Sequence, residues 1–217
     1  FTFAKPERAT KFFPKWWKDL AKNHKNSEQL DMTHCTGFLD LYKKSIIIPA
    51  WFYFFIEVGD SHYSWSFIDG ISHATEHAPF QRGDFRPNED YQHLKLTSHW
   101  LLGCYEDNIF VAFQEPFYSN DIKGIQIASG IVEPKYMSAV NINMFFERTD
   151  ETKKYEFDIG YPLSQLLPLT EREFKIEHLL VSEEEYKNRQ PLKYQSKFAQ
   201  YNRGTKILKQ CPFGGSK

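Results

Sequence analysis

The sequence contains little cysteine and no long apolar run. Its three cysteines, Cys35, Cys104 and Cys211, lie far apart and are odd in number. This argues against a disulfide framework or a Cys-x-x-Cys metal site, and it fits a reducing compartment. The longest apolar run covers residues 46–56, contains Pro49 and falls short of the roughly 18 residues of a membrane-spanning helix. We therefore expect no membrane-spanning segment.

The motifs of several enzyme classes are also absent. The chain has no Gly-x-Ser-x-Gly turn for a nucleophilic serine, no Walker loop and no Gly-x-Gly-x-x-Gly loop for phosphate binding. Cys35 follows His34 directly, but neighbouring side chains on a strand point to opposite faces. We therefore do not expect an activated thiol, and the enzyme classes with these signatures are not indicated.

Four histidines occur within a short stretch, at positions 73, 77, 93 and 99. On a helix, the i, i+4 pair His73 and His77 would be able to chelate zinc, but the stretch is rich in glycine and proline. The chain contains no His-Glu-x-x-His, and no His-x-Asp or His-x-Glu unit for a facial-triad iron site. We therefore interpret these histidines as structural or solvated, and predict no metal site and no cofactor.

What the sequence does contain is typical of a globular, strand-rich protein. Hydrophobic residues make up 41% of its 217 residues, charged residues 25% and aromatic residues 17%. This length suits one large domain with extensions, which needs no metal or disulfide to be stable. The aromatic excess favours strands or large contact surfaces.

The charged residues are unevenly distributed, although the formal net charge is only −1. Residues 1–30 carry a net charge of +4, residues 186–217 carry +8, and residues 31–185 carry −13. Three interpretations of this charge distribution are open. The basic ends could fold back on their own acidic body, they could dock on an acidic neighbour (a second copy or another protein), or they could bind nucleic acid. We expect no nucleic-acid partner, because the C-terminal end lacks dense arginine clusters.

A short amphipathic helix is predicted over residues 12–20, with Pro14 near its start. Its apolar face is formed by Phe13, Trp16, Trp17 and Leu20. Because lysine and tryptophan occur together here, a helix on a membrane surface is one interpretation. Since the segment is only one or two turns long, we expect instead that it lies across the body of the protein as a lid.

From residue 32 to residue 132 the pattern is mostly that of strands. Residues 46–58 and 63–68 predict a hairpin that turns at Gly59-Asp60. Residues 69–92 contain two glycines and two prolines and predict a long irregular loop of functional or interfacial kind. Further strands are predicted over residues 93–102, 108–114, 124–132, 138–146 and 154–159.

The C-terminal region changes to a helical pattern. Ser182 and Glu185 form a capping box at the start of one helix, and a second helix is predicted over residues 192–202. We expect the basic residues of this region to contact a partner together with the two tryptophans of the N-terminal helix. The predicted interaction residues are Trp16, Trp17, Lys193, Lys197, Arg203, Lys206 and Lys209.

Residues 124–169 resemble the core of the dUTPase and dCTP deaminase superfamily, whose barrels have the β-clip fold. Gly130-Ile131-Val132-Glu133 with Tyr136 is similar to one family turn, and Gly160 with Leu163, Gln165 and Leu166 to another. The resemblance implies that Glu133 is the general base and that Tyr136 stacks on the substrate. The family's Arg-Gly after this tyrosine is replaced by Met137-Ser138. On the residues themselves, Gly130 and Gly160 predict a positive φ or a close backbone approach.

A second resemblance spans most of the chain. It comprises Trp16-Trp17-Lys18, Gly37-Phe38-Leu39-Asp40, the Ile46–Trp51 stretch, His99-Trp100 and the turn at Gly160. These segments resemble a family of uncharacterised proteins of large tailed phages, many of them from marine bacteria. The resemblance implies a phage protein that is located in the virion or in the host cytoplasm.

We therefore predict a mainly β protein with a β-clip-like barrel or sandwich, a short N-terminal helix and a helical basic C-terminal arm. The expected divisions are an N-terminal arm (1–35), a β-rich core (36–170) and the C-terminal arm (171–217). The predicted function is a non-enzymatic virion or assembly component that forms a homo-oligomer, such as a trimer, or binds other virion proteins. The alternative is a dUTPase-like nucleotide-binding or nucleotide-hydrolysing enzyme that uses Glu133.

Overall fold

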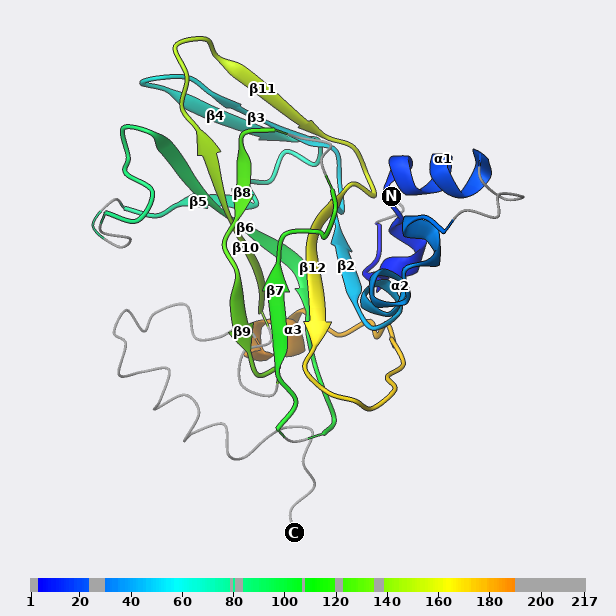
Figure 1. Ribbon diagram of the computed structural model, residues 1–217. Coiled ribbons are helices and arrows are strands. Elements are labelled where there is room, and N and C mark those ends of the chain that lie inside the picture. Colours follow the sequence, from blue (N-terminus) through cyan, green and yellow to red (C-terminus); the bar gives the residue numbers. More distant parts are fainter. Residues whose placement is uncertain are drawn as a thin grey trace.

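The computed structural model describes residues 4–23, 30–78, 80, 84–106, 108–119, 123–134 and 139–189 (Figure 1). Within these ranges the chain is mainly β, with three antiparallel sheets and few helices, so the prediction of a strand-dominated protein is confirmed. The interaction residues predicted from Lys193 to Lys209, and the second C-terminal helix, lie outside the described residues. Among the described residues, no helix is long and apolar enough to span a bilayer.

Five strands form the largest sheet, sheet A, which joins segments far apart in the sequence. Its order is β1 (Glu7–Arg8), β2 (Ile46–Pro49), β12 (Pro162–Pro168), β7 (Val111–Gln114) and β9 (Gly130–Val132). Since β2 and β12 pair, the two ends of the predicted core meet in this sheet.

The other two sheets pack against sheet A around a shared core. Sheet C has the order β5 (Ala74–Glu76), β6 (Tyr91–Leu101), β10 (Ala139–Glu147) and β8 (Ile125–Ile127). Sheet B has the order β11 (Lys153–Phe157), β3 (Phe54–Val58) and β4 (Tyr63–Phe67). The predicted hairpin is confirmed as β3–β4, but the prediction that its first strand runs from residue 46 is wrong, because residues 46–49 form β2 of sheet A.

Aromatic side chains dominate the core between the sheets. Along β3, Phe54, Ile56 and Val58 are buried and alternate with residues that are half-buried, as the two-residue period of a strand requires. The ring of Phe54 stacks on Phe67 at 5.0 Å and on Phe157 at 4.6 Å, which joins all three strands of sheet B. These residues belong to one buried cluster that also contains side chains of sheets A and C.

Short helices lie beside β2, at the edge of sheet A opposite β9 (Figure 1). They comprise the 3-10 turns η1 (Ala9–Phe12) and η2 (Met32–His34) and the helices α1 (Lys15–Asn23) and α2 (Thr36–Lys43). The predicted N-terminal helix is confirmed as α1. The expectation of strands from residue 32 onward is wrong at α2, because Phe38 and Tyr42, one helical turn apart, are buried together against the body.

The structure tests two further local predictions. Helix α3 (Glu183–Arg189) begins after Ser182, whose hydroxyl accepts a hydrogen bond from the Glu185 amide, so the predicted N-cap is confirmed. Gly160 has a φ of +90°, as predicted, and its amide donates to the Ala50 carbonyl. The same prediction is wrong for Gly130, which is an ordinary residue of edge strand β9, where a Cβ would meet no atom within 4 Å.

One fully buried polar side chain joins sheet A to the helices. The Gln165 amide oxygen accepts from the Phe117 backbone N–H at 2.8 Å, and its nitrogen donates to the Ser45 hydroxyl at 2.6 Å. That hydroxyl in turn donates to the Leu41 carbonyl at the end of α2. If one of these buried groups lost its hydrogen-bond partner, the free energy of unfolding would fall.

We expect Gln165→Leu to lower the free energy of unfolding by about 1–3 kcal/mol, because it leaves the Phe117 amide without its acceptor and removes the hydrogen bond that the Ser45 hydroxyl accepts. Urea-induced unfolding measures this change. The matched control is Gln126→Leu on β8, where the side chain is only half-buried, and a change within about 0.5 kcal/mol is expected. Equal stabilities of the two variants would contradict the assignment.

Candidate functional sites

A basic groove lies where α1 and η1 meet sheet A, and we call it the lysine groove. It has a volume of about 370 Å³, within the range of ligand sites. Its walls are apolar, and its charged residues are three lysines and one aspartate. It is lined by Lys11, Phe12, Phe13, Pro14, Lys15, Lys18, Asp19, Tyr42, Ile47, Pro116, Ser119, Gly160 and Pro162.

Stacked aromatic rings beneath α1 hold the lysine groove in shape. Phe13 stacks on Trp17 at 4.1 Å and on Tyr42 at 4.7 Å, and Phe38 stacks on Tyr42 at 4.7 Å. The Trp16 indole N–H donates to the Tyr118 carbonyl at 3.0 Å. Trp16 and Trp17, predicted as interaction residues, are therefore partly buried against the body, where they fix α1 across it as the sequence analysis expected of a lid.

Two of the three lysines of the groove form ion pairs with carboxylates. Lys11 pairs with Glu7 at 2.8 Å, and Lys15 pairs with Asp19 one turn along α1. The hydrogen bond to Asp19 raises the pKa of Lys15, so this side chain stays charged. Within the described part of the chain, no carboxylate pairs with Lys18. An acidic group that entered the groove would therefore meet a positive surface.

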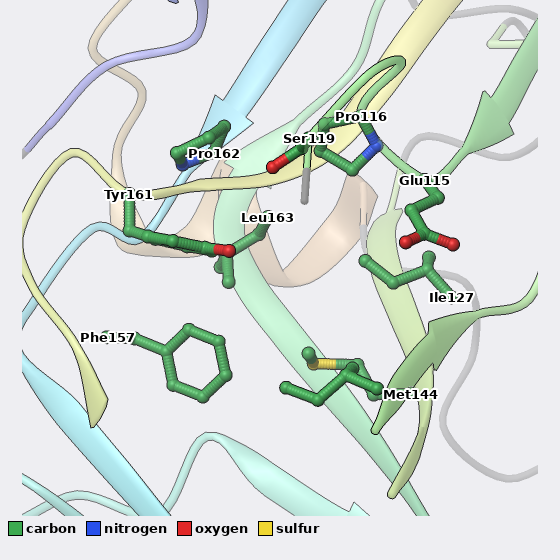
Figure 2. A pocket seen from close by; sticks show the side chains of 10 residues that line it. Glu115, Pro116, Ser119, Ile127, Met144, Phe157, Tyr161, Pro162 and Leu163 are labelled. Carbon is green, nitrogen blue, oxygen red and sulfur yellow. The ribbon is translucent and has the colours of Figure 1, made fainter. Parts of the chain in front are cut away.

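A second, smaller pocket adjoins the groove and shares Pro116, Ser119 and Pro162 with it. Figure 2 shows Glu115 on one side of this pocket and the Tyr161 and Phe157 rings on the other. Its volume is about 30 Å³, which is room for about one water molecule and not for a substrate. Burial raises the pKa of the Glu115 carboxyl.

The alternative catalytic residues fall at the end of β9. Glu133 follows this strand directly and is half-buried, while Tyr136 lies outside the described residues. Glu133 lines neither the lysine groove nor the pocket of Figure 2. The structure thus places Glu133 apart from both of these cavities.

The four histidines of the sequence analysis form two pairs, but not the pairs that their spacing suggests. Strand β5 pairs with β6 so that Ala74 faces Leu96 and Glu76 faces Leu94. Continued by one residue at each end, this register sets His77 opposite His93, and the two rings stack at 4.8 Å. It also sets His73 diagonally across from His99, and their ring centroids are 4.4 Å apart.

Asp69 joins the second pair. Its carboxylate Oδ2 lies 2.7 Å from His73 Nε2, and its Oδ1 accepts from the Ile71 backbone N–H at 3.1 Å. Burial raises the pKa of the Asp69 carboxyl, but the hydrogen bonds from His73 and Ile71 outweigh it, so the pKa lies below its usual value. Burial, and then the nearby His73, lower the pKa of His99, which favours the neutral imidazole.

His73 and His99 stand out in the sequence, but their proximity and the part of Asp69 were not predicted. The signal that was needed is the register of β5 on β6, because Asp69 and His73 share the i, i+4 spacing of a ligand pair but lie in a turn region, and no local spacing links them to His99. No family model, no curated protein and no solved structure matches this chain.

We expect Phe38→Ala to lower the free energy of unfolding by about 3–4 kcal/mol, because the ring is buried among five aromatic neighbours. The same variant should loosen α1 and speed tryptic cleavage after Lys18 and Lys22. Leu39→Ala, the adjacent and half-buried position of α2, is the control and should cost less than half as much. Unchanged cleavage of α1 in the Phe38 variant would contradict this role.

Proposed function

We propose that this protein is a non-enzymatic virion or assembly component of a phage, which acts through contacts between copies of itself. The single observation that carries the proposal is the lysine groove, with its apolar walls and its three lysines. The β-clip-like core, the basic helical C-terminal arm and the phage origin belong to the same proposal, and they rest on the sequence resemblances.

The chain itself offers a segment with the chemistry that suits this groove. Residues 179–185 read Leu-Leu-Val-Ser-Glu-Glu-Glu. The Leu180 side chain is fully exposed and that of Leu179 is largely exposed, although apolar side chains of this size are usually covered. Glu183, Glu184 and Glu185 follow in the first turn of α3. Two apolar side chains and three carboxylates would match the walls and the lysines of the groove.

The match is between two different surfaces of one chain, so it allows a head-to-tail contact that repeats from copy to copy. Head-to-tail contacts between identical subunits close into rings when the rotation between neighbours allows it. A trimer is the ring that the β-clip resemblance leads us to expect. The acidic charge of residues 31–185 would favour such contacts through the basic N-terminal segment, and raised salt would weaken them.

We expect the charge reversal of Lys11, Lys15 and Lys18 to glutamate to convert the oligomer to monomers, because the three acids of α3 would then meet like charges. Reversal of Glu183, Glu184 and Glu185 to lysine in the same chain should restore the oligomer. Sedimentation velocity at low and high salt measures both. Reversal of Lys43 and Lys44, at the end of α2, is the control and should leave the mass unchanged. A wild-type monomer at all concentrations, or an unchanged mass of the triple variant, would contradict the proposal.

The alternative function is nucleotide hydrolysis with Glu133 as general base, and it is tested by a separate experiment. For a non-enzymatic protein, no pyrophosphate should be released from a panel of deoxynucleoside triphosphates with magnesium. Turnover that is lost in Glu133→Gln, with an unchanged melting temperature, would support the enzyme and overturn the proposal.

A further inference from the structure

We propose that Asp69, His73 and His99 bind a first-row divalent transition metal ion, of the kind of zinc or ferrous iron, and leave positions on the ion open to water. This site is independent of the lysine groove, because the two have no residue in common. One ligand atom from each of the three side chains lies within 4.8 Å of the others.

The fold brings these three residues together from separate elements. Asp69 sits in the tight turn after β4, where Gly70 has a φ of +72° and its amide donates to the Phe67 carbonyl. His73 precedes β5, and its carbonyl accepts from the Thr97 amide of β6 at 2.8 Å. His99 lies on β6 itself. The turn and the strand pairing thus fix the backbone of all three ligands. This lowers the conformational entropy that would be lost when an ion binds.

Two of the ligand atoms are already close enough to share an ion. Asp69 Oδ2 and His73 Nε2 are 2.7 Å apart, which is a hydrogen-bond distance, so an ion would replace the proton between them and move the two atoms to the separation of about 3.4 Å that ligands of tetrahedral zinc have. The His99 nitrogen lies within 4.8 Å of the other two ligand atoms, so it has to approach them by up to about 1.4 Å. The His99 ring is on the exposed side of the cluster, where a rotation of its side chain would bring it closer to the ion.

Neighbouring groups orient the ligand side chains by a hydrogen bond to Asp69 and by aromatic packing around His73, as outer-shell groups do in metal sites. The Ile71 amide binds Asp69 Oδ1 and leaves Oδ2 facing the two imidazoles. The His73 ring is 7% exposed and lies among the rings of Trp51, Phe52 and Phe67, with centroid distances of 5.0–6.2 Å. An ordered ligand and an apolar shell on one side both strengthen metal binding.

The donor set determines the class of ion and the kind of site. Two imidazoles and one carboxylate suit zinc, iron, cobalt or nickel, while magnesium and calcium prefer oxygen ligands alone. Structural zinc sites are closed by four protein ligands, whereas sites with three keep a position for water or substrate. The partly exposed Asp69 and His99 leave the ion accessible from the solvent side.

The test uses the full-length protein after treatment with EDTA and dialysis. Titration with Zn²⁺ followed by calorimetry should give one ion per chain, and Co²⁺ should develop a visible absorption band of a site with nitrogen and oxygen ligands. We expect Asp69→Asn and His99→Ala each to weaken Zn²⁺ binding at least tenfold. Zn²⁺ should also raise the melting temperature of the wild type and not that of these variants.

His77→Ala is the matched control, because His77 belongs to the neighbouring cross-strand histidine pair and should leave Zn²⁺ affinity unchanged. Both ligand substitutions are at residues that are partly exposed, so the variants should fold, and their circular dichroism spectra check this. Absence of saturable Zn²⁺ or Co²⁺ binding, or equal affinity of the wild type and His99→Ala, would overturn the proposal. Loss of binding in His77→Ala alone would overturn it as well. None of these outcomes depends on the oligomeric state.

Discussion

The burial of aromatic rings is the constraint on which the rest of this structure depends. The chain has 37 aromatic side chains, and most of those that are buried in the described residues belong to two clusters. In the first, Phe54, Phe67 and Phe157 join the strands of sheet B. In the second, Phe13, Trp17, Phe38 and Tyr42 hold the N-terminal helices against sheet A. Each buried ring removes a large apolar area from water, so these clusters fix where the polar residues around them lie.

Both proposed sites lie at the margins of these clusters. The floor of the lysine groove includes Phe13 and Tyr42, and its lysines come from the short elements that the same rings anchor. Around His73, the rings of Trp51, Phe52 and Phe67 form the apolar wall, and Asp69 and His99 complete the exposed side. The packing that stabilises the fold therefore also orders the side chains that are available for binding.

The sequence predicts those parts of the fold that depend on local signals. The β3–β4 hairpin follows from alternating apolar residues and the Gly59-Asp60 turn, the start of α3 from the Ser182 cap, and the Gly160 turn from glycine itself. Helix α2 was missed because its short sequence has little helical preference of its own and depends on burying Phe38 and Tyr42 against distant elements. Gly130 was misjudged because an edge strand tolerates glycine without needing a positive φ.

The candidate sites depend on contacts that no local pattern records. Trp16 and Trp17 were identified from their spacing, but their partial burial beside Phe38 follows from tertiary packing. Asp69, His73 and His99 are brought together by a turn and by the register of β5 on β6, and a shift of one residue in that register would separate them. Gln165 was named only as part of the turn at Gly160, and its buried hydrogen bonds to Phe117 and Ser45 follow only from the assembled sheet.

The central claim is that the lysine groove of one copy holds the acidic segment of the next. Disulfide trapping tests it most directly, with Lys18→Cys and Glu184→Cys introduced together and separately into a chain in which Cys35, Cys104 and Cys211 are replaced by serine. The account predicts a ladder of cross-linked chains under mild oxidation for the double variant, and none when either cysteine is present alone. A double variant that stays uncross-linked at concentrations where the protein is oligomeric would contradict the claim.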